Sequence, residues 1–195
     1  MSTLATGTFK GRAVLITGAS RGIGAALALA FAREGALVGV NFLGNAVAAD
    51  TVVARCQAEG GDAIALPADV RSPAAVQAMV DSFVAEAGRL DAVVNNAFAP
   101  YRFDPEQRAR FWELGWPSYQ TQFEGAVQAA FHVTQAALPH FRQRGQGSIV
   151  NMASDLVARP TVPYHDYTTA KSALIGFSRN LAAELGPLGI RVNCV

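Results

Sequence analysis

The chain has 195 residues, of which 51% are apolar and 16% are charged, and its formal net charge is +1. This composition is typical of one globular domain with a large core and excludes a disordered chain. No block of like charge stands out, which argues against a nucleic-acid partner and against a membrane surface.

Short apolar runs alternate with helical patterns along the chain. Strands that are apolar throughout are buried on both faces, and their alternation with helices predicts a doubly wound parallel sheet with helices on both sides. We therefore expect a single α/β domain over residues 1–195. The expected elements are, in chain order, a strand at 13–17, a helix at 23–34, a strand at 37–42, a helix at 46–59, a strand at 63–66, a helix at 74–87, a strand at 91–94, a helix at 118–144 that is kinked or shortened near Pro139, a strand at 148–152, a helix at 167–185 and a strand at 191–195.

The composition also bears on the cellular compartment. Cys56 and Cys194 are the two cysteines, too few for a disulfide framework, so a reducing compartment fits. No long apolar segment precedes the first expected strand, and the run at 25–32 is too short to span a membrane. We expect a cytoplasmic protein. The three histidines show no metal-site spacing, so we expect no metal.

The segment TGASRGIG directly follows the first expected strand. In a parallel sheet, ligands bind beyond the carboxyl ends of the strands. Glycines let the backbone approach a pyrophosphate, and the amides of the following helix attract its oxygens. The segment is a candidate phosphate-binding loop; the alternative is a plain tight turn. Its candidate residues are Thr17, Gly18, Ser20, Arg21, Gly22, Ile23 and Gly24.

Three later residues are candidates for catalysis. Tyr167 and Lys171 are four apart, so on a helix they share a face. A nearby ammonium favours the phenolate and lowers the pKa of a tyrosine towards the working range. The alternative is a surface pair. Ser154 comes thirteen residues before Tyr167, just past the fifth strand, where its hydroxyl could hold a substrate carbonyl oxygen.

Together these segments resemble the short-chain dehydrogenase/reductase family over nearly the whole chain. The resemblance rests on residues 17–24, Asp69-Val70, Asn95-Asn96-Ala97, Ser154, Tyr167 and Lys171. It implies a Rossmann-type fold and hydride transfer between a nicotinamide and a carbonyl or alcohol. It also implies that Tyr167 is the general acid in reduction, that Lys171 lowers the pKa of Tyr167 and holds the nicotinamide ribose, and that Ser154 polarises the carbonyl.

The same resemblance suggests further cofactor contacts. Asp69 and Val70 would contact the adenine, Asn95 would support the cofactor and the central sheet, and Ala97 would contact the cofactor. The alternatives are a helix cap for Asp69 and a turn-forming role for Asn95.

The end of the second strand bears on the choice of nicotinamide. Asn41 and Phe42 are candidate cofactor contacts there, and no carboxylate stands in that place to repel a 2′-phosphate. Arg21 could pair with such a phosphate, the alternative being a solvated loop charge. We therefore expect NADP(H).

The sequence departs from the family pattern at three places. Phe98 follows Asn-Asn-Ala where the family has glycine, which reshapes the pocket or re-routes the loop. Ala126 stands where the family has an asparagine that supports a proton relay, so either Glu124 or Gln128 replaces it or the relay is altered. Relatives continue beyond Val195 with a substrate-covering segment and a last strand, so we expect a fragment or a shortened form.

Residues 97–117 form a segment rich in aromatic side chains after the fourth strand. Its place beside the expected active site makes it a candidate wall of the substrate pocket. The alternatives are a loop packed on the long helix and an oligomer contact.

The leading hypothesis is an NADPH-dependent reductase of a 3-oxoacyl thioester or a similar ketone, and a broad ketone or alcohol dehydrogenase is close behind. The partner would be a small carbonyl or alcohol substrate. The alternative is a non-catalytic NADP-binding or scaffold protein, or an inactive fragment of a longer reductase. By resemblance we also expect a homo-oligomer, a dimer or tetramer.

Overall fold

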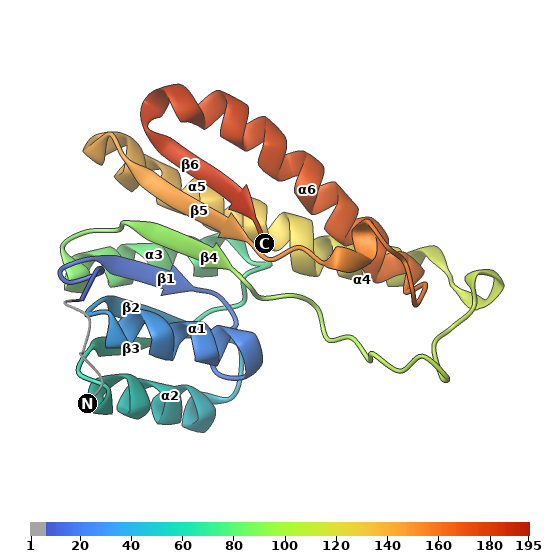
Figure 1. The fold of residues 1–195 in the computed structure, drawn as a ribbon, viewed down its shortest axis with the longest axis horizontal. Coiled ribbons are helices and arrows are strands. Elements are labelled where there is room, and N and C mark those ends of the chain that lie inside the picture. The colour runs from blue at the N-terminus through green and yellow to red at the C-terminus, as the bar shows by residue number, and fades with distance from the viewer. Residues whose placement is uncertain (1–6) are drawn as a thin grey trace.

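A computed structural model describes residues 7–195, which form one six-stranded parallel sheet (Figure 1). The strand order is β3-β2-β1-β4-β5-β6, so the order reverses between β1 and β4, and this is the place where doubly wound sheets bind ligands. The doubly wound parallel sheet expected from the sequence is confirmed. Its strands are β1 Ala13–Ile16, β2 Leu37–Phe42, β3 Asp62–Pro67, β4 Ala92–Asn95, β5 Gly147–Asn151 and β6 Ile190–Cys194.

Helices cover both faces of the sheet, and each face has its own apolar cluster. The helices are α1 Gly22–Arg33, α2 Ala46–Ala58, α3 Pro73–Ala87, α4 Trp116–Phe123, α5 Ala129–Arg144 and α6 His165–Leu185. The cluster on one face joins α1 and α2 to the strands, and the other joins α3, α5 and the end of α6 to them. Shorter turns are η1 Phe111–Glu113, η3 Asp155–Val157 and η4 Gly186–Leu188. Within residues 7–195, none of the helices has the length and apolar character needed to cross a bilayer.

The pattern of buried residues explains why these strands pair as they do. All four residues of the central strand β1 are buried, as expected for a strand covered on both faces. In β6, Ile190 and Val192 are buried whereas Arg191 and Asn193 are exposed. The edge strand is therefore packed on one face, and its other face is polar.

Most predicted boundaries differ from the observed ones by one or two residues, but the long helix differs in kind. It begins at Trp116 and contains a π-helical turn, η2 Glu124–Gln128, between α4 and α5. Of the two expected effects of Pro139, shortening does not occur, because α5 continues past Pro139 to Arg144, the predicted end of the helix. Proline removes one backbone hydrogen bond, but the next turn buries Phe141 completely in the core.

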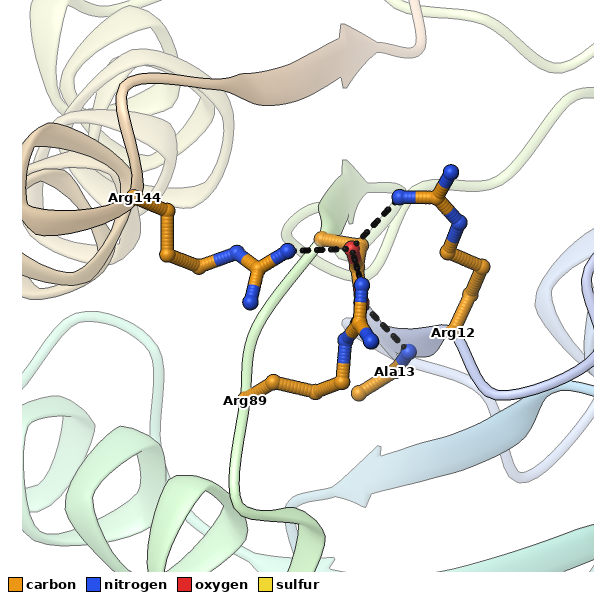
Figure 2. A network of polar contacts seen from close by, with 5 residues as sticks. Arg12, Ala13, Arg89 and Arg144 are labelled. Atoms are coloured by element: carbon orange, nitrogen blue, oxygen red, sulfur yellow. Dashed lines mark hydrogen bonds and ion pairs between the residues drawn. The ribbon is translucent and has the colours of Figure 1, made fainter.

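An ionic cluster at the amino edge of the sheet, the Asp91 cluster, ties the central strands together (Figure 2). Asp91 binds the guanidinium groups of Arg89 at 2.6 Å, Arg12 at 3.1 Å and Arg144 at 3.3 Å, and accepts the Ala13 amide at 2.9 Å. Burial raises the pKa of Asp91, but the hydrogen bonds from Arg89, the Ala13 amide and Arg12 outweigh it and lower the pKa to about 2. One carboxylate thus joins the starts of β1 and β4 to the end of α5.

Replacing Asp91 with Asn should lower the free energy of unfolding by about 2 kcal/mol at pH 7, because three guanidinium groups then face a neutral amide. The folded-state pKa is lowered from 3.8 to about 2, so this stabilisation is complete well above pH 3.8 and is lost as the pH falls through 2. Urea unfolding of wild type and variant should therefore differ at pH 7 and converge near pH 2.

Asp81→Asn is the matched control, because the Asp81 side chain is 57% exposed and its ion-pair partner is His140 at 3.8 Å. An equal loss of stability in both variants at pH 7 would contradict the role given to Asp91.

Candidate functional site

The glycine loop, residues 17–24, connects β1 to α1 at the carboxyl edge of the sheet. Gly18 has φ +63° and lies so close to the segment after β4 that an added Cβ would be 3.0 Å from the Ala97 Cα. A Cβ on Gly24 would lie 2.6 Å from the Gly18 carbonyl oxygen. Among residues 7–195, no side chain caps the amides at the start of α1, which leaves them available to a phosphate. The loop therefore has the shape and donors expected of a pyrophosphate cradle.

The Thr17 hydroxyl joins the end of β1 to the segment that follows β4. It accepts the amides of Asn96 and Ala97, each at 3.0 Å, and the Thr17 side chain is buried. In return, the Asn96 side chain donates to the carbonyls of Thr17 at 2.9 Å and Gly18 at 3.2 Å. Asn96 thus positions the glycine loop. The motif that contains Asn96 was recognised from the sequence, but this role was not.

Asn41 supports the glycine loop from inside the protein, and Phe42 beside it is buried as well. The Asn41 side-chain oxygen accepts the Gly18 amide at 3.1 Å, and its nitrogen donates to the carbonyls of Leu66 and Ala68, both at 3.1 Å. Both side chains are buried, Asn41 at 2% exposure and Phe42 at 7%. The hydrogen bonds of the Asn41 side chain therefore go to the glycine loop and to the segment from Leu66 to Ala68. The sequence had suggested a contact with the cofactor instead.

Asp69 and Val70 follow β3 at the same edge of the sheet. Arg71 binds the Asp69 carboxylate at 2.7 Å through its guanidinium, and this hydrogen bond is the main reason why the pKa of Asp69 is lowered. The Val70 carbonyl is 3.2 Å from a ring nitrogen of His132 on α5. These contacts fix the turn in which an adenine contact is predicted.

Arg21 and Ser20 line an open cleft of about 450 Å³ between α1 and α2. Thr51 and Arg55 line its other side, so two arginines face this space. An anion near the end of the glycine loop would meet positive charge here. Ile23, the remaining loop position, is 62% exposed.

Ser154, Tyr167 and Lys171 converge beyond the carboxyl end of β5. Ser154 caps the short turn η3, where its hydroxyl oxygen accepts the Leu156 amide at 3.3 Å. Tyr167 and Lys171 lie in the first two turns of α6, and the Lys171 Nζ donates to the Met152 carbonyl at 2.6 Å. That nitrogen lies 5.7 Å from the centre of the Tyr167 ring. Ser154 lies close enough to Tyr167 to influence its pKa, so the three side chains lie near one another.

Burial is the largest influence on the pKa values of Tyr167 and Lys171. Burial raises the pKa of Tyr167, and the hydrogen-bonding interaction with Ser154 lowers it only in part. Burial also lowers the pKa of Lys171 to about 8, because the amine is 3% exposed. Burial is thus the largest influence on the pKa of both Tyr167 and Lys171, and the effect of Lys171 on the phenol remains a prediction.

The first part of the aromatic segment, residues 97–103, packs against Tyr167. The rings of Phe103, Tyr101 and Phe98 lie 5.0, 5.3 and 6.2 Å from the Tyr167 ring, and we call these three the aromatic wall. The rest of the segment runs outward from the sheet before it returns at α4 (Figure 1). There Phe111 contacts the His165 ring at 5.6 Å.

A buried carboxylate fastens the aromatic wall to α6. Asp166 is 3% exposed and accepts the Tyr101 hydroxyl at 2.7 Å, the Tyr167 amide at 2.9 Å and the Ser118 hydroxyl. Burial and Asp166 together raise the pKa of Tyr101, so its hydroxyl stays a donor. The sequence did not predict this anchor; its only local signal is an acid directly before Tyr167.

The family pattern described as short chain dehydrogenase matches residues 12–195. The chain belongs to this family.

Three curated relatives show the range of short-chain dehydrogenases that resemble this one. An uncharacterized oxidoreductase of Methylorubrum extorquens is 40% identical, with 95% of this chain and 72% of the relative covered. A probable galactose dehydrogenase of Rhizobium meliloti is 39% identical, with 94% of this chain and 70% of the relative covered. A 3-oxoacyl-[acyl-carrier-protein] reductase of Staphylococcus aureus is 34% identical, covering 94% and 72%.

Solved structures of similar dehydrogenases share the fold. A short-chain dehydrogenase/reductase from Mycobacterium marinum has a TM-score of 0.88 at 31% identity, covering 100% of this chain and 77% of that one. An NAD⁺-bound xylitol dehydrogenase has a TM-score of 0.84 at 32% identity, covering 96% and 70%.

Two further family positions, Asn95 and Ala126, lie in the interior of the protein. Asn95 is buried, and its side chain donates to Asn151 at 2.7 Å, so it belongs to the polar interior of the sheet. Its side-chain oxygen has no hydrogen-bond partner among residues 7–195. Ala126 lies buried in the π-helical turn η2, and Glu124 in the same turn accepts the Gln120 side chain at 2.9 Å. The irregular turn therefore falls where the family asparagine is replaced.

Replacing Tyr101 with Phe should lower the free energy of unfolding by about 1–2 kcal/mol, because the buried Asp166 carboxylate then loses a donor. Urea unfolding measures this loss. Tyr119→Phe is the control, because it removes a hydroxyl outside the Asp166 network from a ring that stacks on Trp116 at 5.7 Å. If the two variants were equally stable, Asp166 would not anchor the aromatic wall.

Proposed function

We propose that this chain is an NADPH-dependent oxidoreductase that transfers a hydride to a carbonyl substrate. Membership of the family makes it an oxidoreductase of the class that uses a nicotinamide cofactor. The observation that carries the proposal is the meeting of Ser154, Tyr167 and Lys171 at the same sheet edge as the glycine loop. A scaffold protein has no need of all three.

The residues at this edge fit a dinucleotide. The close approaches at Gly18 and Gly24 leave backbone where side chains would otherwise stand, and the uncapped start of α1 offers amides to the pyrophosphate. Thr17, Ser20, Gly22, Ile23 and Ala97 complete this set of proposed contacts, with Asp69 and Val70 towards the adenine. When bound, the nicotinamide supplies the hydride.

Three side chains of the chain itself do the acid-base work in this proposal. Ser154 donates to the carbonyl oxygen and orients it. Tyr167 gives its hydroxyl proton to that oxygen as the hydride arrives at the carbon. Lys171 lies next to the phenol, and its amine would bind hydroxyls of the nicotinamide ribose. A positively charged Lys171 would then favour the phenolate left after proton transfer.

The choice of NADPH rests on charge. The end of β2 has the buried Phe42 and no carboxylate, whereas Arg21 and Arg55 line the cleft beside the glycine loop. Both arginines are available to a 2′-phosphate. The NAD⁺-bound structural relative is the reason to measure both cofactors.

The proposed substrate is a 3-oxoacyl thioester or a similar ketone. The relative named as a 3-oxoacyl-[acyl-carrier-protein] reductase supports the first, and the relative named as a probable galactose dehydrogenase supports a wider range of carbonyls and alcohols. The alternative, an NADP-binding protein without catalysis, is favoured by Ala126 at the family asparagine position. We still expect a cytoplasmic location, because of the cysteine content and the apolar pattern, and a homo-oligomer, because of the family resemblance.

A fluorescence titration of the chain with NADPH and NADH should show tighter binding of NADPH. Arg21→Ala should weaken NADPH binding about tenfold or more and leave NADH binding within twofold, because only NADPH has the 2′-phosphate. Arg191→Ala, on the edge strand β6, should change neither. Equal losses for the two cofactors in Arg21→Ala would overturn the NADPH assignment.

Tyr167→Phe should lower kcat by at least about 100-fold, because the ring stays but the transferable proton is gone. Steady-state assays with NADPH and a ketone measure the loss, and the titration should show unchanged cofactor binding. Turnover at the wild-type rate in this variant would favour a different acid or a non-catalytic role.

A further inference from the structure

The aromatic wall is the part of the site that the proposed hydride transfer does not explain. Phe103 meets the Tyr167 ring edge-on at 88°, and Tyr101 lies tilted by 35° against it. Phe98 and Phe103 are 43% and 47% exposed, so each presents apolar surface beside the catalytic ring. A ligand whose carbonyl reaches Tyr167 would touch these rings.

The aromatic wall presents apolar surface to a ligand and has no free hydrogen-bonding group among its three side chains. Phe98 and Phe103 have no polar side-chain atom, and the Tyr101 hydroxyl is already donated to the buried Asp166. The raised pKa of Tyr101 keeps that donor in place across the working range of pH. A sugar or polyol placed here would lose water from its hydroxyls without gaining partners.

The wall is also held in place on several sides. The Ala97 amide is bound to Thr17 at one end, and Asp166 holds Tyr101 in the middle. Between them, the Ala99 backbone packs so closely on Gly125 of the turn η2 that any side chain at Gly125 would collide with it. A surface fixed in this way can stack a ring without first being ordered.

We propose that the aromatic wall selects a carbonyl compound with a flat aromatic ring next to the carbonyl, such as an aryl ketone, and that Phe103 is a specificity-determining residue. The inference rests on the proposed function. The carbonyl carbon accepts the hydride of NADPH, the oxygen accepts the Tyr167 proton, and the products are the secondary alcohol and NADP⁺. Stacked or edge-on ring pairs gain contact that a saturated ring lacks.

The test compares acetophenone with cyclohexyl methyl ketone, which differ only in the saturation of the ring. The ratio of their kcat/KM values in wild type and in Phe103→Leu is measured with NADPH, so the intrinsic reactivity of each ketone cancels. The ratio should fall about fivefold or more in Phe103→Leu. Phe98→Leu is a second variant of the wall and should shift the ratio in the same direction.

Phe111→Leu is the matched control, because Phe111 is on the same segment but its ring contacts His165 rather than Tyr167. Its ratio should stay within twofold of wild type. An unchanged ratio in both wall variants overturns the proposal. So does a higher kcat/KM of the wild type with NADP⁺ for galactose or xylitol than for 1-phenylethanol.

A binding measurement separates this inference from the proposed function. Saturation-transfer NMR on Tyr167→Phe with acetophenone should show contact at the phenyl protons, and Phe103→Leu introduced into that variant should weaken it. If the wild type reduces no ketone but the phenyl contact and its weakening remain, hydride transfer is overturned while aromatic recognition stands. If the phenyl protons show no contact, aromatic recognition is overturned.

Discussion

The Thr17 hydroxyl holds together the two halves on which the rest of the site depends. It lies at the end of β1 and binds the two amides that follow β4, so the glycine loop and the aromatic segment leave the sheet from one shared point. In a doubly wound sheet the strand order reverses between these two strands, and their following segments diverge there. The buried Thr17 hydroxyl therefore positions both the glycine loop, where a dinucleotide would bind, and the start of the segment that carries the aromatic wall.

Features that depend on neighbours in sequence were the ones that could be predicted. The strands are continuous apolar runs, and the helices repeat apolar residues every three to four positions. The order and type of these elements can therefore be predicted from the sequence. The glycine loop and the Tyr167–Lys171 pair are also local patterns. The roles of Asn41 and Asp166 are not local, since Asn41 meets a residue 23 positions earlier and Asp166 binds a hydroxyl 65 positions earlier. No pattern within one element encodes such a meeting.

At two other places, a local effect that the sequence suggests competes with burial. Pro139 removes a hydrogen bond from α5, yet the helix continues because Phe141 completes the core behind the sheet. Lys171 lies near Tyr167, and burial is the largest influence on the pKa of each group, raising that of Tyr167 and lowering that of Lys171. Burial depends on the whole fold, so its size at these positions could not be predicted from the neighbouring residues.

The Asp91 cluster lies at the amino edge of the sheet, and the glycine loop, Tyr167 and the aromatic wall lie at the carboxyl edge. Contacts that hold the strands in register are thus far along the strands from the groups that meet a ligand. Substitutions in residues 97–103 can alter the surface beside Tyr167 while the register of the sheet is kept by other residues. Such a division favours divergence of substrate choice during evolution, and it makes this short segment a natural target for randomised libraries.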